Sequence, residues 1–120
     1  MTLSEKQQQF TFNIHLLIQE AFRMGFKLTF GEVFRTLEQQ KIYFNTGRSK
    51  TMDSRHLQRL AVDFNIFQNG ILINDPKVIQ PLGEFWMSLN TDNRWGGDWN
   101  RNHSILDETF KDPYHFESIP

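Results

Sequence analysis

Two histidines and one aspartate at widely separated positions, His56, Asp63 and His115, constrain the fold of this chain most strongly. Two imidazoles and one carboxylate are the ligand set that leaves a tetrahedral zinc ion one open position for water. If these residues bind one ion, a histidine in a loop, an aspartate on the following strand and a histidine near the C-terminus must converge. Asp112 adds a second carboxylate that can act on the water. These residue types predict a metal-dependent hydrolase.

Each of these four residues also has an ordinary structural interpretation. The chain contains 14 acidic residues and 4 histidines, so histidine and aspartate spacings of this kind also arise by chance. His56 can be a surface loop histidine, and Asp63 can be a solvated strand carboxylate. His115 can be a half-buried, hydrogen-bonded histidine, and Asp112 precedes a proline, as in many turns. The surrounding sequence has to decide between the two interpretations.

Short motifs around these residues share their order and spacing with a known family. They are Ser54-x-His56-x6-Asp63, Trp95-Gly-Gly-Asp98-Trp99 and Asp112-x-x-His115-Phe116, preceded by Phe34-Arg35-Thr36-x-x-x-Gln40 and Gly47-Arg48-Ser49-Lys50. From about residue 30 to residue 117, the chain resembles the zinc D-alanyl-D-alanine carboxypeptidase and L-alanyl-D-glutamate endopeptidase family, which includes many phage endolysins. It departs from that family at Arg59, where many members have a glycine.

The resemblance implies a zinc enzyme that acts on peptidoglycan. Zinc would be bound by His56, Asp63 and His115 and would lower the pKa of its water toward ~7. Asp112 would act as the general base, which takes a proton from the water and passes it to the leaving amine. The expected reaction is hydrolysis of an amide bond in the peptidoglycan stem peptide, with the L-alanyl-D-glutamate bond as the expected site.

The resemblance assigns further roles to three residues near the expected ion, and Asp98 is a fourth candidate. Arg35 would stabilise the oxyanion on the scissile carbonyl, although a salt-bridged surface position is the commoner fate of an arginine. Gln40 and Ser54 would bind substrate. Asp98 would either orient a ligand imidazole through a hydrogen bond or belong to a polar turn.

Two other functions are compatible with the same residues. A D-alanyl-D-alanine carboxypeptidase or dipeptidase would use the same chemistry on a different bond. A catalytically silent relative would keep the fold and the zinc as a binding module. Asp112 and Arg35 together favour an enzyme, because a pure binding module needs no base beside the metal.

The length of 120 residues predicts a single domain, and the resemblance implies an α+β zinc peptidase domain over residues 1–120. Helices are expected over residues 4–24, 36–44 and 75–89, beginning at a capping box of Ser4 and Gln7, at Thr36 and at Asp75-Pro76. Strands are expected over residues 26–34, 60–67, 71–73 and 113–119, and polar loops over residues 45–53 and 90–102. Asn69-Gly70 predicts a hairpin turn. The resemblance implies a small antiparallel sheet with packed helices, as in DD-peptidases, and a zinc cleft on its open side.

Aromatic residues supply bulky material for the expected core, since the chain contains 12 Phe and 3 Trp. We expect six phenylalanines of the first helix and strand to be buried: Phe10, Phe12, Phe22, Phe26, Phe30 and Phe34. Trp95 and Trp99 can belong to the core or wall the cleft. His15, in the first helix, and His103, in a polar loop, are not expected to bind metal.

The composition narrows the functional classes. The chain has no cysteine, so zinc has to be bound through nitrogen and oxygen. A formal net charge of -1 argues against nucleic acid as a partner. The sequence contains no apolar run of about 18 residues and no signal-peptide core, so we expect no stable membrane anchor. We expect a monomer that is made in the host cytoplasm and reaches the cell wall after a separate protein permeabilises the membrane.

Overall fold

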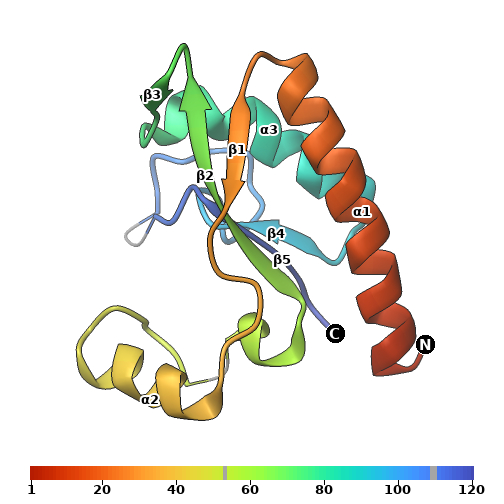
Figure 1. The fold of residues 1–120 in the computed structure, drawn as a ribbon, viewed down its shortest axis with the longest axis vertical. Helices are drawn as coiled ribbons and strands as arrows, with labels where there is room; N and C mark the ends of the chain where they lie inside the picture. Colours follow the sequence, from red (N-terminus) through yellow and green to blue (C-terminus); the bar gives the residue numbers. More distant parts are fainter. Residues whose placement is uncertain (53, 109–110) are drawn as a thin grey trace.

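Figure 1 shows the computed structural model of the chain, which describes residues 1–52, 54–108 and 111–120. The elements follow in the order α1 (Leu3–Arg23), β1 (Lys27–Phe30), α2 (Leu37–Asn45), the 3-10 helix η1 (Arg55–Gln58), β2 (Ala61–Gln68), β3 (Ile71–Leu72), α3 (Pro76–Leu89), β4 (Asn93–Trp95) and β5 (His115–Ser118). Helices packed on an antiparallel sheet confirm the predicted α+β class.

The strands of the described residues form an antiparallel sheet in the order β1-β2-β5-β4, and β3 pairs with the end of β2. Strand β2 holds the sheet together, because its first half pairs with β5 and its second half with β1. Helices α1 and α3 contact each other, and they pack against β1 and β4 respectively. Helix α2 lies apart from both of them, at the lower left of the view in Figure 1, whereas α1 runs along the right side and α3 lies at the top. No helix among the described residues has the length and apolar character to cross a membrane.

Local capping rules account for where the helices begin. At α3, the Asp75 side chain accepts a hydrogen bond from the N–H of Lys77 and Pro76 occupies the first turn, as predicted. At α2, the Thr36 side chain accepts from the N–H of Gln39, also as predicted. The capping box of α1 was expected at Ser4 and Gln7. It is formed instead by Thr2 and Glu5, two residues earlier.

The core lies where the sheet meets α1 and α3. It includes the fully buried side chains of Leu17, Trp86, Trp95 and Phe116. A Cβ atom at Gly83 would lie 2.2 Å from the Trp95 ring, so the absence of a side chain there lets α3 approach this indole. Trp95 therefore belongs to the core, which was one of its two predicted locations.

The prediction of six buried phenylalanines is wrong for four of them. Phe10 and Phe26 are buried, whereas four others are exposed: Phe12, Phe22, Phe30 and Phe34. The buried residues of α1 recur with the helical period from Phe10 through Leu17 to Ala21, and Phe12 and Phe22 fall outside this stripe. Phe30 ends β1, at the edge of the sheet, and Phe34 lies in the following connection.

Two strands also differ from the predicted boundaries. Strand β1 ends at Phe30 rather than at residue 34, although Gly31 N–H still donates to the carbonyl oxygen of Asp63, 2.7 Å away. The predicted loop over residues 90–102 contains β4 (Asn93–Trp95), and a strand this short shows no periodicity in the sequence. The hairpin at Asn69-Gly70 is confirmed, with φ angles of 53° and 77° at the two turn residues.

Candidate metal centre

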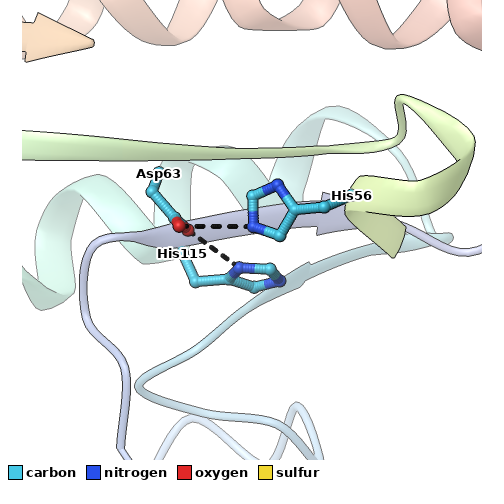
Figure 2. Close-up of side chains that lie close together, drawn as sticks. All are labelled: His56, Asp63 and His115. Atoms are coloured by element: carbon cyan, nitrogen blue, oxygen red, sulfur yellow. Dashed lines mark hydrogen bonds and ion pairs between the residues drawn. The ribbon is translucent and has the colours of Figure 1, made fainter. Parts of the chain in front are cut away.

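His56, Asp63 and His115 lie together in the structure, each from a different element (Figure 2). Each offers a ligand atom, and these atoms all lie within 4.8 Å of one another. Asp63 Oδ2 lies 3.3 Å from Nε2 of His56, and Asp63 Oδ1 lies 3.0 Å from Nδ1 of His115. The three residue types that the sequence singled out therefore converge on one point.

The backbone explains this convergence. Asp63 and His115 are directly opposite each other in the antiparallel pair of β2 and β5, so their side chains share one face of the sheet. That face is opposite to the core, because Val62 and Phe64, the neighbours of Asp63 in β2, point into the core. His56 reaches the same face from η1, whose N-cap Ser54 accepts a hydrogen bond from the N–H of His56 at 3.2 Å.

Arg59 forms the turn that carries the chain from η1 into β2. It ends η1 in the left-handed conformation, with a φ of 56°. Glycine adopts this conformation freely, which accounts for the glycine that many relatives carry at this point. Arg59 makes the same turn, and its guanidinium carbon lies 4.1 Å from the centroid of the Phe34 ring. The departure from the family pattern thus leaves the turn intact.

His56 presents a buried lone pair to the other two residues. Its Nδ1 lies 2.9 Å from the carbonyl oxygen of Val33, so Nδ1 donates to this oxygen, and in the neutral ring the lone pair lies on Nε2. The His56 side chain is 1% exposed, and Nε2 has no hydrogen-bond partner among the described residues. Buried polar atoms are almost always satisfied in folded proteins. An unsatisfied nitrogen that faces a carboxylate and a second imidazole fits a bound cation.

Charges in the cluster shift the pKa values of two of its members. Burial alone would raise the pKa of Asp63, but its contacts with His115 and His56 outweigh this effect and hold the pKa well below its usual range. Burial alone would lower the pKa of His115, but hydrogen bonds with Asp63 and Glu117 raise it to about 9. Asp63 is therefore an ionised carboxylate at neutral pH, as a metal ligand has to be.

Asp112 faces the same cavity as His56 and His115. Burial raises the pKa of its carboxyl group, the positive charge of His115 opposes this rise, and the negative charge of Asp63 adds to it. A raised carboxyl pKa suits a group that takes and returns a proton near neutral pH. A Cβ atom at Gly96 would lie 2.0 Å from the carbonyl oxygen of Asp112, so this glycine permits the close approach of the two chain segments.

Arg35 is held beside the cavity by a network of side chains. Its Nε pairs with Glu32, and Nη1 donates to Gln40 Oε1 at 2.7 Å and to Ser54 Oγ at 3.3 Å. Gln40 is fully buried, and its amide also donates to Ser49 Oγ at 2.9 Å. Arg35 and Ser54 line the cavity, whereas Gln40 lies behind Arg35. These contacts make Gln40 a support for Arg35, and any effect of Gln40 on substrate would be indirect.

The cavity beside the cluster has a volume of about 340 Å³ and a largely basic lining. Five basic residues contribute to it: Arg35, Arg48, Lys50, Arg55 and Arg94. Trp99 also lines it, and the centroid of its ring lies 5.3 Å from that of His115. Of the two tryptophans in the motif, Trp99 walls the cleft and Trp95 belongs to the core. A basic cavity favours an acidic substrate.

Asp98 makes its contacts within its own loop. Its Oδ1 accepts from the N–H of Asn102 at 3.3 Å, and its Oδ2 accepts from the N–H of His103 at 2.8 Å. These bonds match the polar-turn interpretation of Asp98. Asp98 also lies with Glu84 and His103 in a second group whose potential ligand atoms are within 4.8 Å of one another.

Glu117 is the residue of this site whose role the sequence did not reveal. Its Oε1 lies 2.7 Å from Nε2 of His115, on the opposite side of the imidazole ring from Asp63. From the sequence, Glu117 was considered only as a substitute base. Its position two residues after His115 was the available signal, because alternate residues of a strand share a face.

The fold has relatives among solved structures. The L-Ala D-Glu endopeptidase ChiX of Serratia marcescens is 23% identical, with a TM-score of 0.63 over 86% of this chain and 75% of ChiX. A mutant of VanY, the D,D-pentapeptidase of a VanB-type vancomycin resistance cassette, was crystallised with Zn(II). It is 17% identical, with a TM-score of 0.59 over 93% of this chain and 71% of VanY. No curated protein matches the chain.

The fold of these two structures confirms the DD-peptidase-like architecture that the motifs implied. The family described as phage L-alanyl-D-glutamate peptidase matches residues 4–119, which is nearly the whole sequence. The matched range includes every motif on which the resemblance was based. The chain therefore belongs to the phage L-alanyl-D-glutamate peptidase family.

Proposed function

We propose that this chain is a zinc-dependent endopeptidase that hydrolyses the L-alanyl-D-glutamate bond of the peptidoglycan stem peptide. Membership of the phage L-alanyl-D-glutamate peptidase family supports the bond. One observation supports the metal site most strongly: the buried Nε2 of His56 has no hydrogen-bond partner among the described residues and faces Asp63 and His115. Two imidazoles and one carboxylate fit zinc with one position left for water. When bound, zinc would supply a Lewis acid and lower the pKa of that water.

The side chains around the cluster divide the remaining chemistry. Asp112 takes the proton of the attacking water and delivers it to the leaving amine, which a buried carboxyl group with a raised pKa can do. Arg35 donates hydrogen bonds to the oxygen that becomes negative on the scissile carbonyl. Glu32, Gln40 and Ser54 hold the guanidinium in position before substrate arrives.

The basic lining of the cavity fits the substrate. The D-glutamate of a stem peptide keeps a free carboxylate next to the bond that would be cut. Arg48, Lys50 and Arg94 stand along the cavity where they can attract such a charge. As a phage enzyme, the protein would act as a monomer that is made in the host cytoplasm. It would reach the wall once another protein permeabilises the membrane.

Mass spectrometry of the muropeptides released from purified sacculi tests this function. We expect a new amino group on D-glutamate and a new carboxyl group on L-alanine. Release of D-alanine alone would show a D-alanyl-D-alanine carboxypeptidase, and new reducing sugar ends would show cleavage of the glycan. A protein that binds zinc but releases no product would be a silent binding module.

A further inference from the structure

Glu117 contacts His115, a proposed zinc ligand, at Nε2, whereas Nδ1 of the same ring faces Asp63. It follows His115 by two residues on β5, so both side chains lie on the same face of the sheet. Its Oε1 is 2.7 Å from Nε2 of His115, and both side chains are nearly buried. A short contact between a carboxylate and an imidazole N–H in a buried place is a strong, directional hydrogen bond.

This hydrogen bond determines which nitrogen of His115 can bind metal. A neutral imidazole has one N–H and one lone pair. When Glu117 accepts the proton of Nε2, the lone pair is left on Nδ1, which is the nitrogen that faces Asp63. In His56, the carbonyl oxygen of Val33 accepts from Nδ1, which leaves the lone pair on Nε2. In each histidine, the nitrogen that faces away from the proposed ion thus donates a hydrogen bond. The acceptor is a neutral carbonyl for His56 and a carboxylate for His115.

The backbone under Glu117 is held by the core. The fully buried indole of Trp86 donates to the carbonyl oxygens of Glu117 and Arg94, each at 3.0 Å. Glu117 and Arg94 are also directly opposite each other in the pair of β4 and β5. The carboxylate therefore extends from a strand that cannot shift without disturbing the core.

We infer that Glu117 is a positioning residue for the metal centre, which orients His115 and keeps its Nδ1 lone pair directed at the ion. This inference rests on the proposed zinc site. Carboxylates that accept from the outer nitrogen of a ligand histidine typically contribute ~10- to 100-fold in metal affinity. The same contact occupies Glu117 on the far side of the imidazole, so Asp112 is left as the base.

The test is zinc affinity, measured by competition with a chelator on the metal-free full-length chain. Glu117→Ala should weaken zinc binding by ~10- to 100-fold. Glu117→Gln keeps an oxygen that can accept from Nε2 and should restore part of this loss. The matched control is Glu84→Ala, which removes another carboxylate bonded to a histidine, Glu84 to His103 at 2.6 Å, and should leave the affinity unchanged.

A spectroscopic readout separates positioning from a general structural role. In the zinc-loaded wild type, the His115 N–H held by Glu117 should give a downfield proton resonance that is protected from exchange, and Glu117→Ala should lose it. A folded Glu117→Ala variant with wild-type zinc affinity would overturn the inference, as would a Glu117→Gln variant no better than Glu117→Ala. Absence of zinc binding by the wild type would instead overturn the proposed metal centre, and the inference with it.

Discussion

Two groups of histidine and carboxylate occur in this molecule, and only one of them is built like a metal site. His56, Asp63 and His115 form one group, and Glu84, Asp98 and His103 form the other. By distance alone they are equivalent, because the potential ligand atoms of each group lie within 4.8 Å of one another. They differ in burial: the side chain of His56 is 1% exposed, and that of His103 is 69% exposed.

The two groups also differ in which atoms are already occupied. In the second group, both oxygens of Asp98 accept backbone N–H groups of their own loop. In the first group, Asp63 directs both oxygens at imidazoles, and Nε2 of His56 has no hydrogen-bond partner among the described residues. Proximity of ligand types is therefore insufficient. A metal site also needs ligand atoms whose lone pairs accept no hydrogen bond from the protein, and a rigid backbone that keeps those atoms in place.

The largest expected difference between the two groups is in catalysis. His115→Ala removes a proposed zinc ligand and should reduce lysis of permeabilised cells below detection, because the two remaining ligands would not hold the metal. His103→Ala should lyse the cells at close to the wild-type rate, measured as loss of turbidity. Equal losses in the two variants would mean that the comparison is wrong.

The next effect separates catalysis from metal binding at the cavity beside the first group, which Asp112 lines. Asp112→Asn removes the proposed general base, and proton transfer by such a base is typically worth ~10²-fold or more in rate. Zinc content and thermal stability should stay close to those of the wild type, because the ligands remain. Rates on purified sacculi and metal analysis of the same preparation provide the measurement. A variant with near wild-type rate would show that Asp112 is only a turn residue.

A smaller effect is expected on the pH dependence of stability in the metal-free protein. The pKa of His115 is raised from 6.5 to about 9 in the folded chain. Its contribution to stability is therefore fully present below about pH 6.5 and is lost as the pH rises through about 9. The melting temperature of chelator-treated protein should fall by several degrees over this range. His115→Gln should flatten this fall, and His103→Gln should preserve it.

The smallest effect is expected at the turn that connects His56 to Asp63. Arg59→Gly removes left-handed strain but also loses the contact with Phe34 and makes the unfolded chain more flexible. These terms oppose each other, so the free energy of unfolding should change by less than ~1 kcal/mol. Arg59→Ala keeps the strain and loses the contact, and it should be the less stable variant in denaturant titrations. The opposite order would show that the turn is not left-handed in solution.

The parts of the fold that follow local rules were predictable from the sequence. Asp75-Pro76 begins α3 and Asn69-Gly70 forms the hairpin because each effect depends on neighbouring residues alone. Strand β4 was not predictable, since three residues carry no period and the strand exists because it pairs with β5. The exposure of Phe30 and Phe34 has the same origin, because it depends on which edge of the sheet is left uncovered.

The candidate site divides in a similar way. The grouping of His56, Asp63 and His115 was predictable because the motifs around them share their order and spacing with a family of zinc peptidases. The burial of Gln40 behind Arg35 was not predictable, because it depends on how the connection after α2 folds back over that helix. Glu117 was missed for a related reason. Its strand spacing indicated the face that it shares with His115, but only the structure shows the contact.

Metal analysis of three proteins tests the central claim most directly. After dialysis against buffer without metal, the wild type and His103→Ala should each retain about one zinc per chain, and His56→Ala should lose it. The reason is that His56 offers a buried lone pair with no hydrogen-bond partner among the described residues, whereas His103 lies at the surface. Full zinc retention by His56→Ala, or loss of zinc from His103→Ala, would contradict the account.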